Sequence, residues 1–430
     1  MSQPENVPAP KQDATAEREP KGYVLTYSLA MYGLMICIMM PALGGLSIRL
    51  QDINNGNLKA ATAQLSIVTG CGAIFALFAQ PLFGRLSDRT RGKFGMRRPW
   101  IIAGVVGAGL SVAGIGFAKN MTTLLVLWCL AQTFSNMAQA AETATLPDQV
   151  PENRRGIVSG IAGACSPLGM LTGSLLLAVF SQDAPRFVVP GIIDIIFGII
   201  FALVLKDKVF SKDKELKPLS VKEFFGSFVF NPRKAPDLGW TWLSKFFVMF
   251  GSAAVGSYLT LFLAAKFGMK TSEQTKFNLY FNIVEIGMVI IVSVLGGKLS
   301  DQFGKRRPFV AASGIIIALG VLLIAFAPVF GHAVGLVAIL VGGGVMGGGS
   351  GLFFAVDMAL STEVLPSTED TAKDLGVLNI ANTLPQSIAP FIANWIIAAV
   401  GGAGFTVWFC IGAVVAVAGG ITVMKVKSVE

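Results

Sequence analysis

Residues 84–100 read GRLSDRTRGKFGMRRPW, and a shorter copy of this stretch, GKLSDQFGKRRP, occupies residues 297–308. In each copy an apolar run precedes the first glycine and another apolar run follows the R-R-P. A motif that recurs once, at the same place relative to the apolar runs, indicates an internal repeat. The sequence therefore predicts two similar halves that follow each other in parallel orientation.

The apolar runs around these motifs are long enough to cross a bilayer. Only 14% of the 430 residues are charged, whereas a typical soluble domain carries about 25%. A helix of about 20 apolar residues spans the ~30 Å hydrocarbon core, so the composition excludes a soluble globular enzyme, a disordered chain and a disulfide scaffold. We predict an all-α membrane protein with twelve transmembrane helices in two pseudo-symmetric six-helix bundles. The helices are expected at residues 23–50, 61–83, 99–118, 122–146, 156–180, 187–205, 240–267, 276–299, 308–328, 333–362, 374–400 and 404–425.

The basic residues predict the orientation of these helices. With both termini in the cytoplasm, 26 of the 34 Lys and Arg residues fall on the cytoplasmic side and seven on the outer side. Cytoplasmic loops of membrane proteins carry such an excess of positive charge. We expect a multi-pass protein of the cell membrane with cytoplasmic termini, and the net charge of +9 needs no nucleic-acid partner to explain it.

The runs also predict the domain organisation. We expect a disordered cytosolic tail at residues 1–22, a bundle at 23–205, a cytosolic linker at 206–238, a second bundle at 239–425 and a short cytosolic tail at 426–430. The linker contains a capping box followed by phenylalanines, which is typical of a short interfacial helix but equally compatible with an ordinary polar linker. The five cysteines lie in apolar runs, with no spacing typical of a metal site or a disulfide framework.

The repeated motif places acidic and basic residues together at the ends of helices. The carboxylate of Asp88 can accept hydrogen bonds from neighbouring arginines or from a helix N-terminus. Such a cluster can close one end of the protein in one conformation and release it in another. A basic loop that only sets topology is the alternative, and the recurrence of the motif favours gating. The candidate gating residues are Asp88, Arg89, Arg98, Glu142, Asp148, Arg155, Asp301, Arg307 and Glu363.

Three carboxylates lie within the expected membrane spans, where an ionisable group costs free energy and is therefore a candidate for function. Glu285 lies near the middle of its helix, Asp357 in the inner half of the tenth helix, and Asp194 in the sixth helix. Burial favours the neutral form of a carboxyl group, so each of the three is a candidate for binding a coupling proton. The alternative for Glu285 is an ion pair with a base such as Lys245, and the alternative for Asp194 is simple burial against a neighbouring helix.

Amide and hydroxyl side chains form stripes along several of the expected helices. Residues spaced by three, four or seven positions share one face of a helix, and such a face can hold sugar hydroxyl groups. Hydrogen bonding between helices is the commoner explanation for any single one of them. The candidate substrate-binding residues are Gln132, Asn136, Gln139, Asn278, Asn282, Asn379, Asn382, Gln386 and Tyr32.

Residues 88–100 follow the pattern D-R-T-R-x-K-F-G-x-x-R-P-W. This pattern resembles the glycoside–pentoside–hexuronide:cation symporter branch of the major facilitator superfamily, and it is similar to the loop of the related sucrose transporters. The resemblance implies twelve helices around a central cavity, alternating access, and symport of a sugar or glycoside with a cation. The acids that it implies for binding sodium are replaced here by Ala76, Gln80 and Gln139, which favours a proton.

Together these patterns predict a proton-coupled symporter of a sugar or glycoside. A proton-driven exporter of drugs or metabolites with the same fold is the first alternative, and a non-transporting membrane receptor is an alternative of another class. We expect no catalytic activity, no cofactor and no metal. The expected partners are a small-molecule substrate, a coupling cation and the lipid bilayer, and the chain is expected to be a monomer.

Overall fold

The computed structural model of the chain describes residues 19–207, 235–364 and 371–427, and these residues form helices joined by short loops. The first half contains α1 (Tyr23–Met40), the π-helical segment η1 (Pro41–Gly45), α2 (Leu46–Ile53), α3 (Leu58–Asp88), α4 (Arg98–Ile115), α5 (Met121–Gln149), α6 (Glu152–Val179) and α7 (Asp183–Val204). The second half contains α9 (Pro236–Gly256), α10 (Leu259–Phe267), α11 (Thr271–Phe303), α12 (Arg307–Phe326), the 3₁₀ segment η2 (Ala327–Phe330), α13 (His332–Glu363), α14 (Thr371–Val400), η3 (Gly401–Ala403) and α15 (Gly404–Val423). The predicted tail at 1–22, the linker at 206–238 and the tail at 426–430 lie largely outside the described residues.

The helices are long and apolar enough to account for the expected crossings. In the described part of the chain nine helical stretches qualify as membrane spans by length and composition, or ten if the bent pair α9 and α10 counts as one crossing. One of these stretches, Ile380–Val423, joins α14 and α15. The long helix α5 is not among these stretches, because its amide and hydroxyl side chains make it more polar than the qualifying helices. Separating α14 from α15 and adding α5 gives twelve crossings, so the predicted all-α fold is confirmed.

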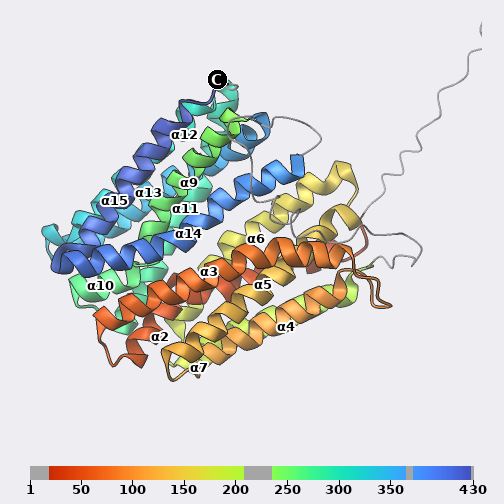
Figure 1. Cartoon of the computed structure of the whole chain (residues 1–430), viewed down its shortest axis with the longest axis horizontal. Coiled ribbons are helices and arrows are strands. Elements are labelled where there is room, and N and C mark those ends of the chain that lie inside the picture. Colours follow the sequence, from red (N-terminus) through yellow and green to blue (C-terminus); the bar gives the residue numbers. More distant parts are fainter. Residues whose placement is uncertain (1–18, 208–234, 365–370, 428–430) are drawn as a thin grey trace, which may run out of the picture.

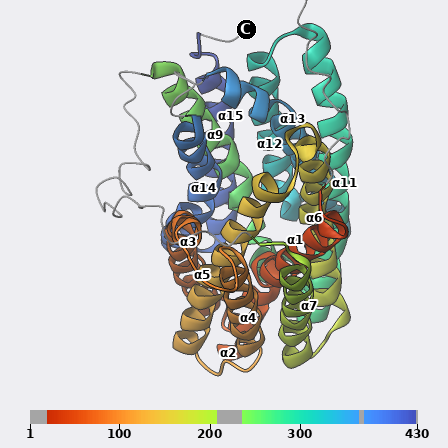
Figure 2. The same ribbon diagram turned by 90° about the vertical axis from the view of Figure 1, so that its right-hand side faces the viewer.

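The two halves repeat one packing arrangement. In the first half α4 packs on α5 and α7, α3 on α5, and α1 on α6 and α7. In the second half α12 packs on α13 and α15, α11 on α13, and α9 on α14 and α15. The helices of the first half gather on one side of the molecule and those of the second half on the other (Figures 1 and 2). The structure therefore has the internal repeat that the two copies of the basic motif predict.

Glycine allows several of these helix pairs to approach closely. A Cβ added to Gly109 of α4 would lie 2.6 Å from the carbonyl oxygen of Gly191 of α7. One added to Gly320 of α12 would lie 2.6 Å from the carbonyl oxygen of Gly342 of α13. No larger side chain fits at such contacts, which are typical of helix packing within membranes. Gly342 of α13 thus serves close packing.

Two crossings that the sequence predicts as continuous helices are broken. The first is interrupted by η1 at Pro41–Gly45, and the seventh bends by 45° between α9 and α10. Pro41 lacks the N–H that would continue the ladder of hydrogen bonds, which explains the irregular turn. Because helices 1 and 7 occupy equivalent places in the repeat, both halves carry a break at the same depth.

In the described part of the chain the halves meet through α3 with α14, α6 with α11 and α2 with α10, away from the end that carries the basic motifs. We call the end that carries residues 84–100 and 297–308 the basic end, and the opposite end the distal end. Near the distal end the amide of Gln51 in α2 donates to Gln274 of α11 at 3.2 Å, and Asn282 of α11 donates to Ser174 of α6 at 2.8 Å. Figure 1 shows the two groups of helices coming together near α2 and α10 and spreading apart in the other direction.

Helix α6 shows this difference along its own length. In its basic-end part the buried residues Val158, Ala162 and Cys165 recur at helical spacing and face α1, while residues on the other sides of the helix are exposed. In its distal part Ser174 and Leu177 are buried, and here α6 also packs on α11. The structure is therefore open between the halves toward the basic end.

Candidate functional site

The basic motif of the first half forms a charge network around Arg97. The guanidinium group of Arg97 is buried and contacts Asp88 at 2.5 Å, Asp148 at 3.3 Å and the hydroxyl of Ser87 at 2.5 Å. Because Asp88 ends α3, Arg97 precedes α4 and Asp148 lies near the end of α5, one arginine ties three helix ends together. The sequence prediction named both aspartates but not Arg97, although R-R-P recurs in both copies of the motif.

The start of α4 is held by the chain that follows α7. One carboxylate oxygen of Asp207 accepts the backbone N–H groups of Arg97 and Arg98, at 2.7 and 2.8 Å. A carboxylate at a helix N-terminus satisfies free N–H donors and complements the helix dipole. The guanidinium of Arg98 donates to the carbonyl oxygen of Leu205 at 2.5 Å, which fixes the same junction a second time.

The second half repeats these contacts. Arg306 donates to the hydroxyl of Ser300 at 2.8 Å, as Arg97 does to Ser87. Arg307 donates to the carbonyl oxygen of Val426 at 2.6 Å, as Arg98 does to Leu205. The two copies of the motif therefore build the same junction between a loop, the next helix and the end of the half.

The other candidate gating residues have different surroundings. Arg155 donates to the carbonyl oxygens of Val150 and Pro147, and its neighbour Arg154 pairs with Glu19 at 3.2 Å. Arg89 also makes interactions within the described part of the chain. The side chains of Asp301 and Glu363 lie outside the described set.

Glu142 lies apart from this network. Its side chain in α5 is fully buried, and neither carboxylate oxygen has a hydrogen-bond partner in the described part of the chain. Next to it, the hydroxyl of Thr145 donates to the backbone carbonyl oxygen of Glu142 at 2.7 Å and is hydrogen-bonded to Tyr23 of α1, also at 2.7 Å. The acid therefore points into the packed helices of the first half.

Asp194 in α7 is buried in the same manner. It has no exposed surface, and both its oxygens lack a hydrogen-bond partner among the described residues. The buried thiol of Cys37 lies beside it, and Glu142 is close enough to interact with it electrostatically. Gly33 of α1 packs against the Asp194 backbone, since an added Cβ would lie 3.2 Å from the Asp194 Cα.

Asp357 is paired instead. Its carboxylate in α13 contacts the ammonium group of Lys245 in α9 at 2.8 Å, and Lys245 also reaches the hydroxyl of Ser361 at 3.4 Å. The two charged side chains are 13% and 6% exposed. Lys245 therefore neutralises Asp357 and not Glu285, the acid for which the sequence suggested it as a partner.

Glu285 has no such neighbour. It lies in α11, is partly buried, and makes no hydrogen bond or ion pair with any described residue. Its backbone packs against α13, because a Cβ added to Gly347 would lie 3.0 Å from the Glu285 Cα. Glu285 is one helical turn from Asn282, whose amide binds Ser174 in the other half.

The candidate substrate-binding residues fall into two groups. Asn278 and Asn282 are buried at the junction between the halves, where Asn278 donates to Thr260 at 2.9 Å. The others are more accessible: Gln132, Asn136 and Gln139 on α5 and Asn382 on α14 are partly exposed, and Gln386 is exposed. Asn136 donates to the carbonyl oxygen of Gln132 in its own helix, and Tyr32 is hydrogen-bonded to Thr172 of α6 at 2.6 Å. The Asn379 side chain lies outside the described set.

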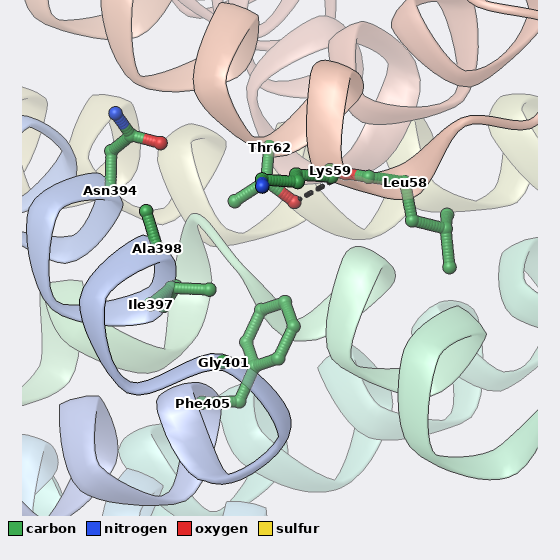
Figure 3. Close-up of a pocket in the computed structure, with 8 residues that line it drawn as sticks. All are labelled: Leu58, Lys59, Thr62, Asn394, Ile397, Ala398, Gly401 and Phe405. Carbon is green, nitrogen blue, oxygen red and sulfur yellow. Dashed lines mark hydrogen bonds between the residues drawn. The ribbon is translucent and has the colours of Figure 1, made fainter.

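A small cavity lies elsewhere, at the distal end. It has a volume of about 270 Å³ and is lined by residues of α3, α14, η3 and α15: Leu58, Lys59, Thr62, Asn394, Ile397, Ala398, Gly401 and Phe405. Figure 3 shows these side chains, with the hydroxyl of Thr62 bonded to its own helix at Leu58. The cavity contains no carboxylate and none of the predicted site residues, so the candidate functional site is the set of membrane-embedded acids and amides instead.

Comparison with known proteins shows which transporters the chain is similar to. It is 34% identical to the Sucrose transport protein SUC4 of Arabidopsis thaliana over 26% of this chain and 26% of that relative, so it spans about a quarter of the relative's length. It is 23% identical to the Multidrug resistance protein MdtG of Proteus mirabilis over 69% of this chain and 70% of that protein. The crystal structure of the nucleoside transporter NupG has the same fold, with a TM-score of 0.70, 13% identity and coverage of 94% of this chain and 99% of NupG.

The family profile covers the whole helical part of the chain. The profile of the Major Facilitator Superfamily matches residues 23–344 and 241–429. These overlapping matches include both copies of the basic motif and both groups of six crossings. The chain belongs to the Major Facilitator Superfamily and is a multi-pass membrane transporter, not an enzyme.

Proposed function

We propose that the protein is a proton-coupled symporter that carries a sugar or glycoside by alternating access. The observation that carries this proposal is the position of Glu285, a carboxyl group within the membrane span of α11 that no described residue neutralises. Lys245, which could have neutralised it, is held by Asp357. A carboxyl group in such a place exchanges a proton more easily than it holds a charge.

The position of Glu285 connects proton binding to the contact between the halves. Glu285 lies three residues after Asn282, so the two side chains share a face of α11. Asn282 bonds to Ser174 across the junction of the halves. A proton that binds or leaves Glu285 changes the charge beside this contact, and a change in charge can shift the balance between two conformations.

The substrate class rests on the accessible polar side chains of α5 and α14. Amides at Gln132, Asn136 and Gln386 offer both donors and acceptors, which suit neutral hydroxyl groups. The similarity to a sucrose transport protein favours the same class, although it spans a quarter of the chain. The branch of the superfamily is proposed on this similarity and on the motif at residues 88–100.

We place the basic end in the cytoplasm of a cell-membrane protein that works as a monomer. Loops with an excess of Lys and Arg remain on the cytoplasmic side during insertion. In this orientation the structure is open to the cytoplasm and closed at the outer surface. Labelling of a single cysteine at Lys93, an exposed position of the basic end, checks the orientation in intact cells with an impermeant reagent.

Uptake into vesicles tests the proposed function. The purified protein is reconstituted, and a panel of labelled sugars and glycosides is presented with an imposed proton gradient or, separately, a sodium gradient. We expect accumulation under the proton gradient alone. Glu285→Gln should abolish accumulation but retain exchange of substrate down its gradient, while Glu273→Gln, an exposed acid of the same helix, should accumulate substrate normally. Accumulation by Glu285→Gln equal to that of the wild type would contradict the assignment of Glu285.

A proton-driven exporter is the second candidate, because the match to a multidrug resistance protein extends over 69% of the chain. The same vesicles distinguish the two functions. A symporter moves protons and substrate in the same direction, whereas an exporter exchanges them. Drug efflux that acidifies the compartment the drug leaves, with no sugar uptake, would favour the exporter.

A further inference from the structure

We propose that Glu142 and Asp194 form a second proton-binding site, which lies inside the first half of the protein and is separate from Glu285. The sequence assigns Glu142 to a gate and Asp194 to proton coupling, and it does not predict that the two acids act together. The proposal deepens the proton-coupled function and rests on it for the transport measurement below. The binding of protons itself is tested independently of transport.

Both acids of the pair are buried away from solvent. Glu142 on α5 and Asp194 on α7 are each 0% exposed. All four of their carboxylate oxygens lack a hydrogen-bond partner in the part of the chain that the structure describes. Both helices pack on α4, and α1 packs against α7 and α5, so two further helices, α4 and α1, flank the helices that carry the acids.

The groups that face the pair are neutral. Helix α1 contributes Tyr23 and Tyr27 near Glu142 and Cys37 near Asp194, and α6 contributes Cys165 beside Tyr27. These phenols and thiols can donate weak hydrogen bonds, but they supply no positive charge.

The nearby arginines are bound elsewhere. Of those at the start of α4, Arg97 holds Asp88 and Asp148, and Arg98 holds a backbone carbonyl oxygen. At the start of α6, Arg154 pairs with Glu19 and Arg155 donates to backbone carbonyl oxygens. Among the described residues no base therefore neutralises either acid of the pair.

Burial without a partner determines the protonation of the pair. Moving an isolated carboxylate into apolar surroundings costs far more than taking up a proton, so the group becomes neutral instead. Both Glu142 and Asp194 therefore hold a proton in this conformation. Interaction between the two acids acts in the same direction, since a negative charge on one disfavours a negative charge on the other.

The second half shows that the fold does not require a buried acid to be neutralised by a proton. Leu146-Pro147 aligns with Leu365-Pro366 in the internal repeat, and the same offset places Ser361 opposite Glu142. In the second half this region contains the ion pair of Lys245 and Asp357, with Ser361 as a hydroxyl partner of the lysine. One half thus neutralises its buried acid with a lysine, and the other half with protons.

Helix α1 controls access to the protons. It covers Asp194 at Gly33 and is joined to α5 by the hydrogen bond between Tyr23 and Thr145. Water can reach the pair if α1 moves away from α5 or α7. The crossing that begins with α1 is broken at Pro41–Gly45, beside the junction of the two halves. A change of conformation at this junction and the release of the protons would therefore both involve movement of α1.

Infrared spectroscopy of the purified, detergent-solubilised protein tests whether the pair is protonated. Glu142→Gln and Asp194→Asn each replace a neutral acid by an amide of nearly the same shape. At neutral pH each should remove part of the carbonyl band of protonated carboxyl groups, and the double variant should remove both parts. Asp148→Asn, which changes an ion-paired carboxylate of the same helix, should leave this band unchanged. An unchanged band in both single variants of the pair would overturn the proposal.

Transport tests whether the protons leave during the cycle. In vesicles, Glu142→Gln and Asp194→Asn should lose accumulation under a proton gradient and retain substrate exchange, with thermal midpoints in detergent close to that of the wild type. Normal accumulation in both variants would contradict the claim that the protons of the pair are exchanged during transport. If the wild type fails to accumulate any substrate under a proton gradient, the proposed function fails, while the infrared result still decides whether the pair holds protons.

Discussion

The membrane-embedded acids of this protein are neutralised in two different ways. Asp357 contacts Lys245, whereas Glu142, Asp194 and Glu285 have no base among the described residues. A buried ion pair recovers the cost of desolvation only when both partners are present, and a lone charge in the same place is strongly destabilising. The two kinds of site therefore respond in opposite ways when one side chain becomes neutral.

A double-mutant cycle of Lys245 and Asp357 is expected to show that removal of either partner alone destabilises the protein. Asp357→Leu leaves an unpaired lysine, and Lys245→Met leaves an unpaired aspartate, so each single change should lower stability by about 3 kcal/mol. The double variant should be more stable than either single one, because no charge remains buried. Thermal unfolding in detergent measures all four proteins, and additive losses would contradict a direct pair.

The surroundings of Glu142 also show that the sequence does not reveal which residues a buried acid contacts. Its neighbours along the chain, Asp148 and Arg155, predict a shared charge network. In the structure Asp148 binds Arg97, which precedes another helix, and Arg155 turns to backbone carbonyl oxygens. The presence of an acid in a membrane span is visible in the sequence, but its partners come from other helices.

At the scale of single helices, glycine decides how closely α13 packs. A Cβ added to Gly347 would overlap the backbone carbonyl oxygen of Glu285 on α11, whereas one added to Gly348 would have its nearest neighbour, a side-chain methyl of Val292, at 3.6 Å. The first contact is with rigid backbone and the second is an ordinary contact. Adjacent glycines of one helix thus have different tolerance for a methyl group.

This contrast gives a matched pair of variants. Gly347→Ala should separate α11 from α13 and lower the free energy of unfolding by about 2 kcal/mol. Gly348→Ala should be neutral or slightly stabilising, because alanine favours the helix over glycine. Equal thermal midpoints for the two variants would show that α11 and α13 do not approach each other as described.

Helix positions follow from the sequence better than helix breaks do. The predicted span 156–180 and the observed α6, Glu152–Val179, agree within a few residues. The predicted spans 23–50 and 240–267 appear instead as two helical pieces each. Apolar composition reports membrane burial for the whole crossing, whereas a break depends on local hydrogen bonding and on what packs beside it.

At the scale of the whole molecule, the conformation is set by contacts near the distal end. Asn282 bonds to Ser174, and Gln51 bonds to Gln274, across the two halves. Such a hydrogen bond contributes about 1 kcal/mol, which corresponds to about a fivefold change in the ratio of two conformations. The internal repeat and the twelve crossings could be predicted from the sequence, but the conformation could not, because it depends on contacts between halves that have no sequence pattern in common.

Removal of one such contact should therefore shift the protein toward closure of the basic end. Spin labels at Lys93 and Lys305, exposed positions at the basic end of each half, report the separation of the halves by pulsed electron paramagnetic resonance. In Asn282→Ala the short-distance population should grow about fivefold. Asn54→Ala, which breaks a hydrogen bond to Gln64 within one half, should leave the distances unchanged. A loss of the short-distance population in Asn282→Ala would contradict this account.

The ion pair of Lys245 and Asp357 has an electrical consequence. A single charge that crosses the membrane gains or loses about 2.3 kcal/mol per 100 mV, so an unpaired lysine on a moving helix would make the transport cycle depend on voltage. Because the opposite charge of Asp357 lies 2.8 Å away, α9 and α13 can move together without carrying net charge through the field. The membrane potential then acts on the protons that enter and leave, and the helices themselves contribute no gating current.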